Sequence, residues 1–533
     1  MTINSINPII PGFSPDPSLV KVDDWYYLVN STFHMFPGLP IYASRDLVSW
    51  KHISQSLPSA RLNTTPRSNL SILGNAINRP NQLSLTKSNT KLGELPHSDE
   101  VMLMTGGLYA PTIRYRQGTF YLVCTNIVDS GSDGVSENFI VTTEDVWKGE
   151  WSDPVYFDFK GIDPSILFDG DKAYIQGSAA PGPFTKINLF EVDLTTGKKL
   201  SEERTIWGGT GGVYPEGPHL YKRNGWYYLM ISEGGTFDGH MITMARSQDI
   251  WGPYDPCPNN PILTARDTKE YIQYTGHCEA FQDETGQWWG VCLGVRKDEG
   301  GRLIMGRETF LTRGNWDGEW LSFETVKSHI AGLTLKDGST ALSAVGNVDY
   351  LYIRDANLGN YDIHDNSSIT LTTSAVDLSH PQTSPTFIGK RQRKLLGQSN
   401  VTIRSFADNF QAAKLRSGIA CYKDEHRYVR IFYDASDCAV VFELINNAKK
   451  IAETERRSLG KVPEELALRI EYTEKEYRLL YNAGGGLGEN WTSLATTDTL
   501  NMTGPDFVGP VIGIFAIAET NDLKVELEDF HVD

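Results

Sequence analysis

The chain repeats a pattern in which a short apolar strand leads through a polar turn into a second strand rich in aromatic residues. The clearest second strands are Trp25–Leu28, Ala173–Ile175 and Trp226–Leu229. The turns between paired strands combine Asp, Asn and Gly, which favours tight hairpins. Apolar runs of four to eight residues bounded by such turns are typical of β-strands, so we predict an all-β protein with few helices.

Five copies of this unit can be recognised, and each begins with a small, acidic or polar residue that is usually followed by proline. They start at Asp16, Ala110, Asp163, Gly217 and, less clearly, His277. After the first copy the spacing is roughly the fifty residues of a four-stranded blade with its loops. We therefore predict a five-bladed β-propeller over residues 1–325. A β-sandwich of similar strands is an alternative, but it would not bring equivalent positions together.

The repeated phrase stops near residue 335, and alternating strands separated by polar turns follow it, for example 428–433 and 466–472. This pattern predicts a second all-β domain over residues 346–533, most simply a β-sandwich, joined to the propeller by a linker at 326–345. Within the first blade, residues 56–105 form an insertion rich in Ser, Asn, Pro and Leu that we expect to border the propeller mouth.

Composition narrows the classes of partner. A net charge of −17 argues against nucleic acid, because phosphate-binding surfaces need a basic excess. No apolar run approaches the ~20 residues of a membrane span. The N-terminus lacks the basic start and apolar run of a signal peptide, so we expect a cytoplasmic protein unless a leader has been removed. The six cysteines contain no Cys-x-x-Cys pair, so neither a zinc site nor a disulfide framework is indicated. Nothing in the sequence defines the oligomeric state.

Three of the repeats carry an acid at their start: Asp16, Asp163, and Glu216 one residue before Gly217. The first strand of every propeller blade lines the axis, so these carboxyl groups are expected to meet at one mouth. Hydrolysis of a glycosidic bond uses one protonated and one ionised carboxyl group. A third acid raises the pKa of its neighbour, since like charges in one pocket disfavour double ionisation. A single Asp-Pro-Ser is often only a turn, but three acids in register favour chemistry.

These phrases resemble glycoside hydrolase family 43, specifically its β-xylosidase and α-L-arabinofuranosidase-like members with a C-terminal β-sandwich (concanavalin-like) domain. The resemblance covers nearly the whole chain and rests on Asn7–Ser18, Ser31–Gly38, Asp163–Ser165, Pro215–Leu220, Gly276–His277, Gly306–Thr309 and Ser384–Gln392. It implies an inverting exo-glycosidase that removes terminal xylose, arabinofuranose or both from xylan-derived hemicellulose oligosaccharides, with a small oligosaccharide as its partner and no required cofactor.

The resemblance also implies roles for individual residues. Asp16 is similar to the general base that activates water, Glu216 to the general acid, and Asp163 to the acid that tunes the pKa of Glu216 and orients it. Inversion implies about 6.5–9.5 Å between base and acid. Arg296 matches an arginine that reaches a sugar hydroxyl and the acid cluster, although such a residue can equally be a surface arginine.

Four further residues are implied as substrate-binding. Phe33 would supply an apolar wall for the sugar ring, and Tyr109 stands where many relatives have tryptophan. Phe507 matches a loop of the second domain that closes the pocket. His277 takes the axial position of the fifth blade, where family members place a histidine, sometimes beside a hydrated cation such as Ca²⁺. Phe33 and His277 could instead be ordinary core residues.

A non-catalytic carbohydrate-binding propeller is the alternative from another functional class, because a fold alone does not decide function. The acids discriminate between the two. A binding propeller does not need three converging carboxyl groups, and the second and fifth repeats show that the unit forms without one. The sequence does not rank xylose against arabinose.

Overall fold

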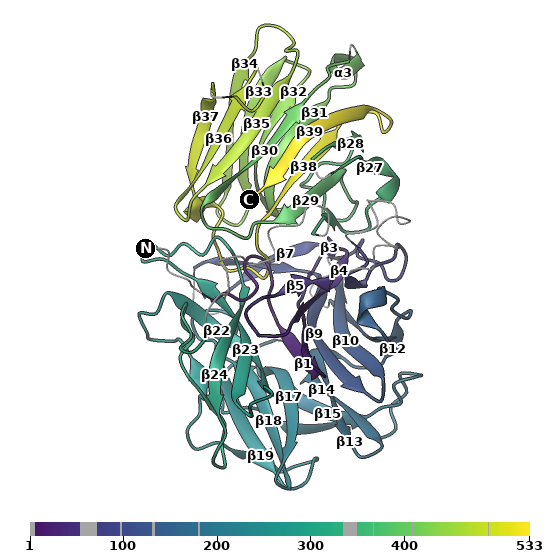
Figure 1. The fold of residues 1–533 in the computed structure, drawn as a ribbon, viewed down its shortest axis with the longest axis vertical. Coiled ribbons are helices and arrows are strands. Elements are labelled where there is room, and N and C mark those ends of the chain that lie inside the picture. Colours follow the sequence, from purple (N-terminus) through teal and green to yellow (C-terminus); the bar gives the residue numbers. More distant parts are fainter. Residues whose placement is uncertain are drawn as a thin grey trace.

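The computed structural model describes residues 6–53, 72–95, 99–129, 134–179, 182–333, 349–365, 367–407, 409–484, 486–488 and 490–533. Two β-rich bodies are stacked along the long axis of the molecule (Figure 1). The N-terminal body is drawn in purple to teal and the C-terminal body in green to yellow. Among the described residues, no helix is long and apolar enough to cross a membrane.

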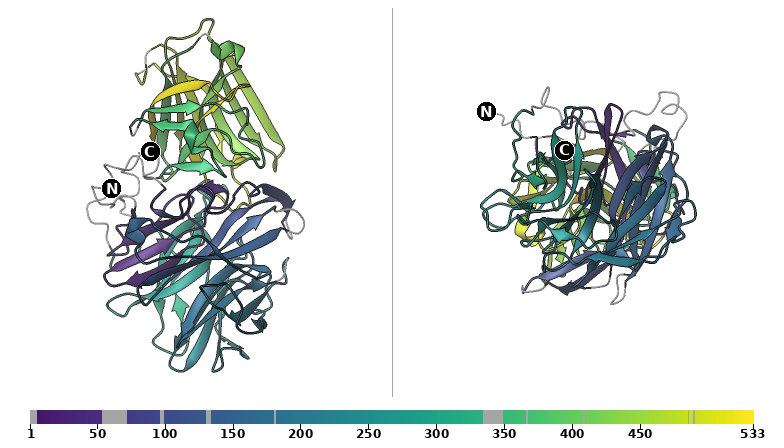
Figure 2. Two further views of the ribbon diagram at one scale, coloured as in Figure 1. Left: turned by 90° about the vertical axis from the view of Figure 1, so that its right-hand side faces the viewer. Right: turned by 90° about the horizontal axis from the view of Figure 1, so that it is seen from below.

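Five antiparallel sheets of four or five strands form the blades of the N-terminal body, which confirms the predicted five-bladed propeller. Figure 2 shows the sheets from the side and from below. From the axis outward the blades are β1 (Ser18–Val22), β2 (Trp25–Val29), β4 (Gly38–Ser44), β5 (Lys51–His52); β9 (Gly107–Arg116), β10 (Thr119–Val128), β11 (Val135–Thr143), β12 (Val155–Phe157); β13 (Gly161–Asp169), β14 (Lys172–Ala179), β15 (Lys186–Glu191), β16 (Arg204–Trp207); β17 (Glu216–Arg223), β18 (Trp226–Glu233), β19 (Met241–Ser247), β20 (Asp255–Pro256); and β22 (Ile272–Gln282), β23 (Trp288–Arg296), β24 (Glu308–Asn315), β25 (Ser322–Phe323). Two short strands join the outer parts of these blades, β6 (Asn75–Ile77) on β4 and β21 (Leu263–Thr264) on β19.

The five repeat starts share one backbone conformation. Their φ angles are 52° at Asp16, 42° at Ala110, 55° at Asp163, 55° at Gly217 and 41° at His277. In the last four blades the pairing between the inner strand and its neighbour also shifts register at this point. A left-handed residue with a local bulge turns the side chains at a strand entrance. The repeat seen in the sequence is therefore a repeated structural device at the mouth of the propeller.

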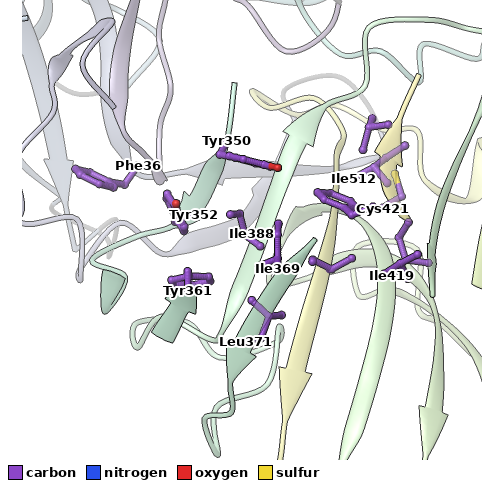
Figure 3. Close-up of a cluster of buried hydrophobic side chains, with 14 of the residues drawn as sticks. Phe36, Tyr350, Tyr352, Tyr361, Ile369, Leu371, Ile388, Ile419, Cys421 and Ile512 are labelled. Carbon is purple, nitrogen blue, oxygen red and sulfur yellow. The ribbon is translucent and has the colours of Figure 1, made fainter. Parts of the chain in front are cut away.

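The C-terminal body is a β-sandwich whose core lies between two large sheets. The eight-stranded sheet has the order β3 (Met35–Phe36), β26 (Leu351–Ile353), β29 (Phe387–Arg391), β38 (Val511–Ile517), β31 (Arg416–Asp424), β32 (Arg427–Asp434), β33 (Ala439–Asn446), β34 (Ile451–Ser458). The seven-stranded sheet has the order β27 (Tyr361–Ile363), β28 (Ile369–Thr372), β39 (Lys524–Val532), β30 (Gly397–Ile403), β35 (Leu466–Tyr472), β36 (Glu476–Asn482), β37 (Thr492–Asp498). Ile369 and Leu371 of one sheet and Ile388, Ile419 and Ile512 of the other belong to one buried cluster (Figure 3).

The propeller lends its strand β3 to the sandwich, so the two bodies share a sheet. Tyr352 of β26 pairs with Phe36 of β3, and both side chains lie in the cluster of Figure 3. Arg391 Nε donates to the backbone oxygen of Phe13 at 2.8 Å, three residues before Asp16. The sandwich is thus bonded to the chain on both sides of the first acid. The blades end at Phe323 and the sandwich strands resume at Leu351, while residues 334–345 of the predicted linker lie outside the described residues.

The described part of the 56–105 insertion reaches the sandwich. Its hairpin, β7 (Thr90–Glu94) and β8 (Val101–Thr105), docks through Leu103 N, which donates to Pro505 O at 2.9 Å. Thr90 N donates to Glu425 Oε1 at 2.5 Å. The hairpin therefore braces the segment that carries Phe507. Residues 56–71 and 96–98 of the insertion lie outside the described residues.

Candidate active site

The acids Asp163 and Glu216 are neighbours across two blades. Gly217 N, directly after Glu216, donates a hydrogen bond to Asp163 Oδ2 at 3.0 Å. Asp163 begins the third repeat and is 7% exposed. One carboxylate is thus bonded to the backbone that carries the other, which fixes the pair in position.

Both carboxylate oxygens of Asp16 have partners, and the side chain is buried. Arg307 Nη1 donates to Oδ1 at 3.1 Å, and Ser31 Oγ donates to Oδ2 at 2.7 Å. Ser31 Oγ in turn accepts from Ala110 N at 2.7 Å. Asp16 is therefore held in one orientation by Ser31 of its own blade and by Arg307 of the segment before β24, while Ala110 of the second blade fixes Ser31.

The three acids influence one another electrostatically. The pKa of Glu216 is raised well above its usual value, first by burial and then by the negative charges of Asp163 and Asp16; Arg307 opposes the rise. Burial, followed by the charge of Asp16, raises the pKa of Asp163 to about 6, against the lowering effects of His277, the Gly217 N–H and Arg307. A carboxyl group kept protonated near neutral pH can donate a proton, which suits Glu216 to general-acid chemistry.

Three aromatic residues predicted from the sequence meet beside this cluster. The ring of Phe33 lies 4.7 Å from that of Tyr109 and 5.9 Å from that of Phe507. Arg307 lies over both phenylalanines, at 5.5 Å and 5.2 Å from the ring centroids. Its Nη2 also donates to Phe507 O at 3.1 Å. The sandwich thus contributes Phe507 to an apolar wall next to Asp16, as expected for a flat sugar face.

The arginine at the acid cluster is Arg307, whereas the sequence analysis assigned this place to Arg296. Arg296 donates instead to Glu308, from Nε at 2.7 Å and from Nη2 at 2.8 Å. Glu308 begins β24, and Arg307 immediately precedes it. Successive residues of a strand point to opposite faces. Arg307 therefore faces the acids, whereas Glu308 points the other way and pairs with Arg296. The phrase Gly306–Thr309 contained the signal, but not the direction of each side chain.

His277 lies at the axis, as expected, within a polar ring that sequence reasoning missed. Its backbone N donates to Ser232 Oγ at 2.8 Å, and its ring is perpendicular to that of His219 at 6.4 Å. His219 and Glu279 stand two positions after their repeat starts, as do Ser18, Thr112 and Ser165. Ser18 Oγ donates to Glu279 Oε2 at 2.6 Å. Side chains two positions apart on a strand point to the same face, so counting two residues from each repeat start would have predicted this second ring.

A model of glycosyl hydrolases family 43 matches residues 5–76 and 66–321. A model of the β-xylosidase C-terminal concanavalin A-like domain matches residues 347–532. The chain belongs to glycoside hydrolase family 43. This family 43 enzyme therefore hydrolyses glycosidic bonds, and its two bodies correspond to the catalytic propeller and the concanavalin-like sandwich.

Relatives match over most or all of the chain. A non-reducing end α-L-arabinofuranosidase of Bacteroides ovatus is 32% identical over 98% of this chain and 94% of its own. A xylosidase/arabinosidase of Humicola insolens is 36% identical over 59% of this chain and 54% of its own. These names describe glycosidases and lend no support to a non-catalytic binding propeller.

Solved structures of the family have the same two-body fold. The Bacteroides ovatus xyloglucan-locus family 43 protein superposes with a TM-score of 0.80 at 30% identity, covering 99% of this chain and all of its own. The family 43 protein BlXynB of Bacillus licheniformis gives 0.78 at 27% identity, with 98% of each chain covered. The sandwich is therefore a regular part of this enzyme architecture.

Proposed function

We propose that the enzyme is an inverting exo-glycosidase that releases terminal xylose, arabinofuranose or both from xylan-derived oligosaccharides. The observation that carries the proposal is the unequal environment of the acids. Glu216 has a raised pKa beside two further carboxyl groups, whereas Asp16 is bonded to Arg307 and Ser31. One acid is thus suited to give a proton and another to remain ionised and accept one.

In the proposed reaction, Glu216 donates its proton to the glycosidic oxygen as the bond from that oxygen to the anomeric carbon breaks. Asp16 takes a proton from a water molecule, whose oxygen attacks the anomeric carbon from the opposite face. Asp163 keeps the pKa of Glu216 high and bonds the backbone of Gly217. Arg307 holds Asp16 against the sugar wall of Phe33. The protons balance, because Glu216 loses the one that the leaving group gains and Asp16 gains the one that the water loses; proton exchange with solvent then restores both acids.

Exo action follows from the position of the second body. Phe507 lies at the sugar wall, and the β7–β8 hairpin braces its segment through Pro505. A polymer could not run through a cleft that is walled on this side. The names of the relatives include both xylosidases and arabinofuranosidases, and both sugars are pentoses that fit the same apolar wall. Product analysis on xylobiose and on arabinose-decorated xylo-oligosaccharides separates these activities.

No cofactor enters the proposed reaction, and a hydrated cation such as Ca²⁺ beside His277 stays a prediction. The described residues contain no group of three or more His, Cys, Asp and Glu that could hold a metal ion. A cation would therefore be bound mainly through water. The buried Nε2 of His219 has no hydrogen-bond partner within the described parts of the chain, and its ring contacts that of His277. This nitrogen could accept a hydrogen bond from a water molecule of such an ion.

The cytoplasmic location stays a prediction. Asn30, which begins the glycosylation sequon Asn30-Ser31-Thr32, is fully buried. Its amide donates to Ser14 O and Pro15 O at 3.0 Å each and to Thr309 Oγ1 at 2.8 Å. A glycan at this position would not fit the folded propeller, in agreement with that prediction. Fractionation of the producing cells tests it.

The experiment that tests the function compares leaving groups. Glu216→Gln should lose about 10²–10⁴-fold in kcat/KM on xylobiose, yet far less on an aryl glycoside whose phenol needs no proton. Asp16→Asn should lose activity on both, because water activation is needed in each case. Wild-type rates in both variants, on xylosides and on arabinofuranosides, would refute the proposal.

A further inference from the structure

Glu233 is a buried acid that the proposed reaction does not use. It ends β18, has no exposed surface, and lies next to Ser232, which binds the backbone of His277. An ionised carboxylate with no contact to water must be satisfied by protein donors. The groups that donate hydrogen bonds to Glu233 therefore show which part of the structure it holds in place.

Most of these partners belong to the loop that enters the strand of the general acid. Thr210 N donates to Glu233 Oε1 at 2.9 Å and to Oε2 at 3.1 Å. Thr210 Oγ1 and Gly212 N each donate to Oε2 at 3.1 Å. Within the described parts of the chain, the one partner outside the loop is Thr243 Oγ1 on β19, which donates to Oε1 at 2.5 Å. Backbone N–H groups that converge on an anion form a nest, a strong local restraint.

The loop needs such a restraint because of its composition. Residues 208–212 read Gly-Gly-Thr-Gly-Gly, and Gly209 and Gly211 have φ angles of 78° and 101°. Glycine has the largest conformational freedom, so a segment of this kind has little order of its own. Only Val213, Tyr214 and Pro215 separate it from Glu216. A displacement of the loop would therefore be passed to the acid.

Two of the glycines are shaped to the carboxylate. A Cβ at Gly209 would lie 2.8 Å from the Glu233 carboxylate, and a Cβ at Gly212 would lie 2.8 Å from its Oε2. Both distances are too short for a real side chain. The loop thus wraps the carboxylate closely, which explains why glycine stands at these positions.

Glu233 also starts the segment that reaches the base. Gly234 N donates to Val213 O at 2.7 Å, which ties this segment to the acid's loop. Three residues after Glu233, Thr236 Oγ1 accepts from Arg307 Nη1 at 3.1 Å, the same atom that binds Asp16. Glu233 therefore lies between the loop that carries Glu216 and the segment that contacts Arg307, which binds Asp16. Inversion requires a limited range of separation between these two groups.

We propose that Glu233 is a positioning residue for the general acid: its carboxylate is the anchor around which the glycine-rich loop folds, and this loop delivers Glu216 to the glycosidic oxygen. The inference rests on the proposed function of Glu216. It does not give Glu233 a contact with substrate. Its loss should therefore weaken proton donation rather than water activation.

The test is Glu233→Gln, assayed on xylobiose and on 4-nitrophenyl β-xyloside, or on the matching arabinofuranosides if arabinose is the sugar released. An amide has one acceptor oxygen instead of two, so the loop bonds cannot all be kept. We expect kcat/KM to fall roughly 10- to 100-fold on the disaccharide and less than about 3-fold on the aryl glycoside. A purely structural role would lower both rates equally.

Thr243→Val is the matched control, since it removes one bond to Glu233 without touching the loop; the ratio of the two rates should stay that of the wild type. Gly212→Ala displaces the loop and keeps the buried acid, and it decides the matter if Glu233→Gln does not fold. Selective loss in Glu216→Gln with equal or no loss in Glu233→Gln and Gly212→Ala would overturn this inference and leave the proposed function standing. Absence of selectivity in Glu216→Gln would overturn both.

Discussion

Asp163 raises the pKa of Glu216, but its own buried charge lowers the stability of the folded protein at neutral pH. The substitution Asp163→Asn measures this loss of stability. The pKa of Asp163 rises from 3.8 to about 6 in the folded protein. The stability contributed by its protonated form is complete below about pH 4 and is lost as the pH rises through 6. At about 1.4 kcal/mol for each unit by which the folded pKa exceeds the unfolded one, the loss of stability reaches about 3 kcal/mol by pH 8. Asparagine is not subject to this loss.

The assay is urea unfolding of both proteins at pH 4 and pH 8, followed by tryptophan fluorescence. Of the 12 tryptophans, all but Trp491 lie in the propeller part of the sequence, so the signal reports the body that contains Asp163. The stability of Asp163→Asn relative to the wild type should increase by about 2.5 kcal/mol between the two pH values, since a small part of the loss has already occurred at about pH 4. A difference that does not change with pH would refute the reasoning.

Asp169 offers a control on the same strand. Its hydrogen bond from Lys222, followed by that from Tyr227, lowers its pKa below the usual value. Stability from such a group is present at high pH and is lost on acidification through the folded pKa. Asp169→Asn should therefore become less stable relative to the wild type as the pH rises, with a sign opposite to that of Asp163→Asn.

Three further substitutions test the supports of the site. Arg307→Met should lower kcat/KM about 10²–10³-fold by breaking a buried ion pair. It should also move the alkaline limb of the pH–rate profile to higher pH, because Arg307 lowers the pKa of Glu216. A limb at the same pH would contradict this. Phe507→Ala should raise KM about 10-fold through lost apolar contact, and an unchanged KM would exclude Phe507 from the pocket. Ser31→Ala should lower kcat about 10-fold by freeing one oxygen of Asp16, with KM unchanged; a rise in KM alone would point to substrate binding instead.

The sequence predicted the propeller because its repeat has a local cause. Asp16, Ala110, Asp163, Gly217 and His277 occupy one backbone conformation at one place in each blade, so a short phrase recurs wherever that bulge recurs. For the same reason the meeting of the acids could be predicted without coordinates. The resemblance implied that Phe33 and Tyr109 both bind the sugar, and the structure has their rings 4.7 Å apart.

Contacts between distant segments could not be predicted in this way. The choice of Arg307 over Arg296 depends on which face of β24 each side chain takes and on the pairing of Arg296 with Glu308. The addition of β3 to the sandwich depends on how the two bodies dock. The anchoring of the loop by Glu233 joins residues more than twenty positions apart. Each is a product of tertiary packing, for which a single sequence carries no local signal.

The central claim is that Glu216 and Asp16 act on opposite faces of the sugar, and the anomeric form of the first product tests it most directly. Proton NMR during hydrolysis of a β-linked xylobiose or aryl β-xyloside, recorded faster than mutarotation, should show α-xylose first and β-xylose only later. An α-arabinofuranoside would likewise give the β-anomer first. Initial release of the anomer with the substrate's own configuration would contradict the account, since it would require a carboxylate to attack the sugar in place of water.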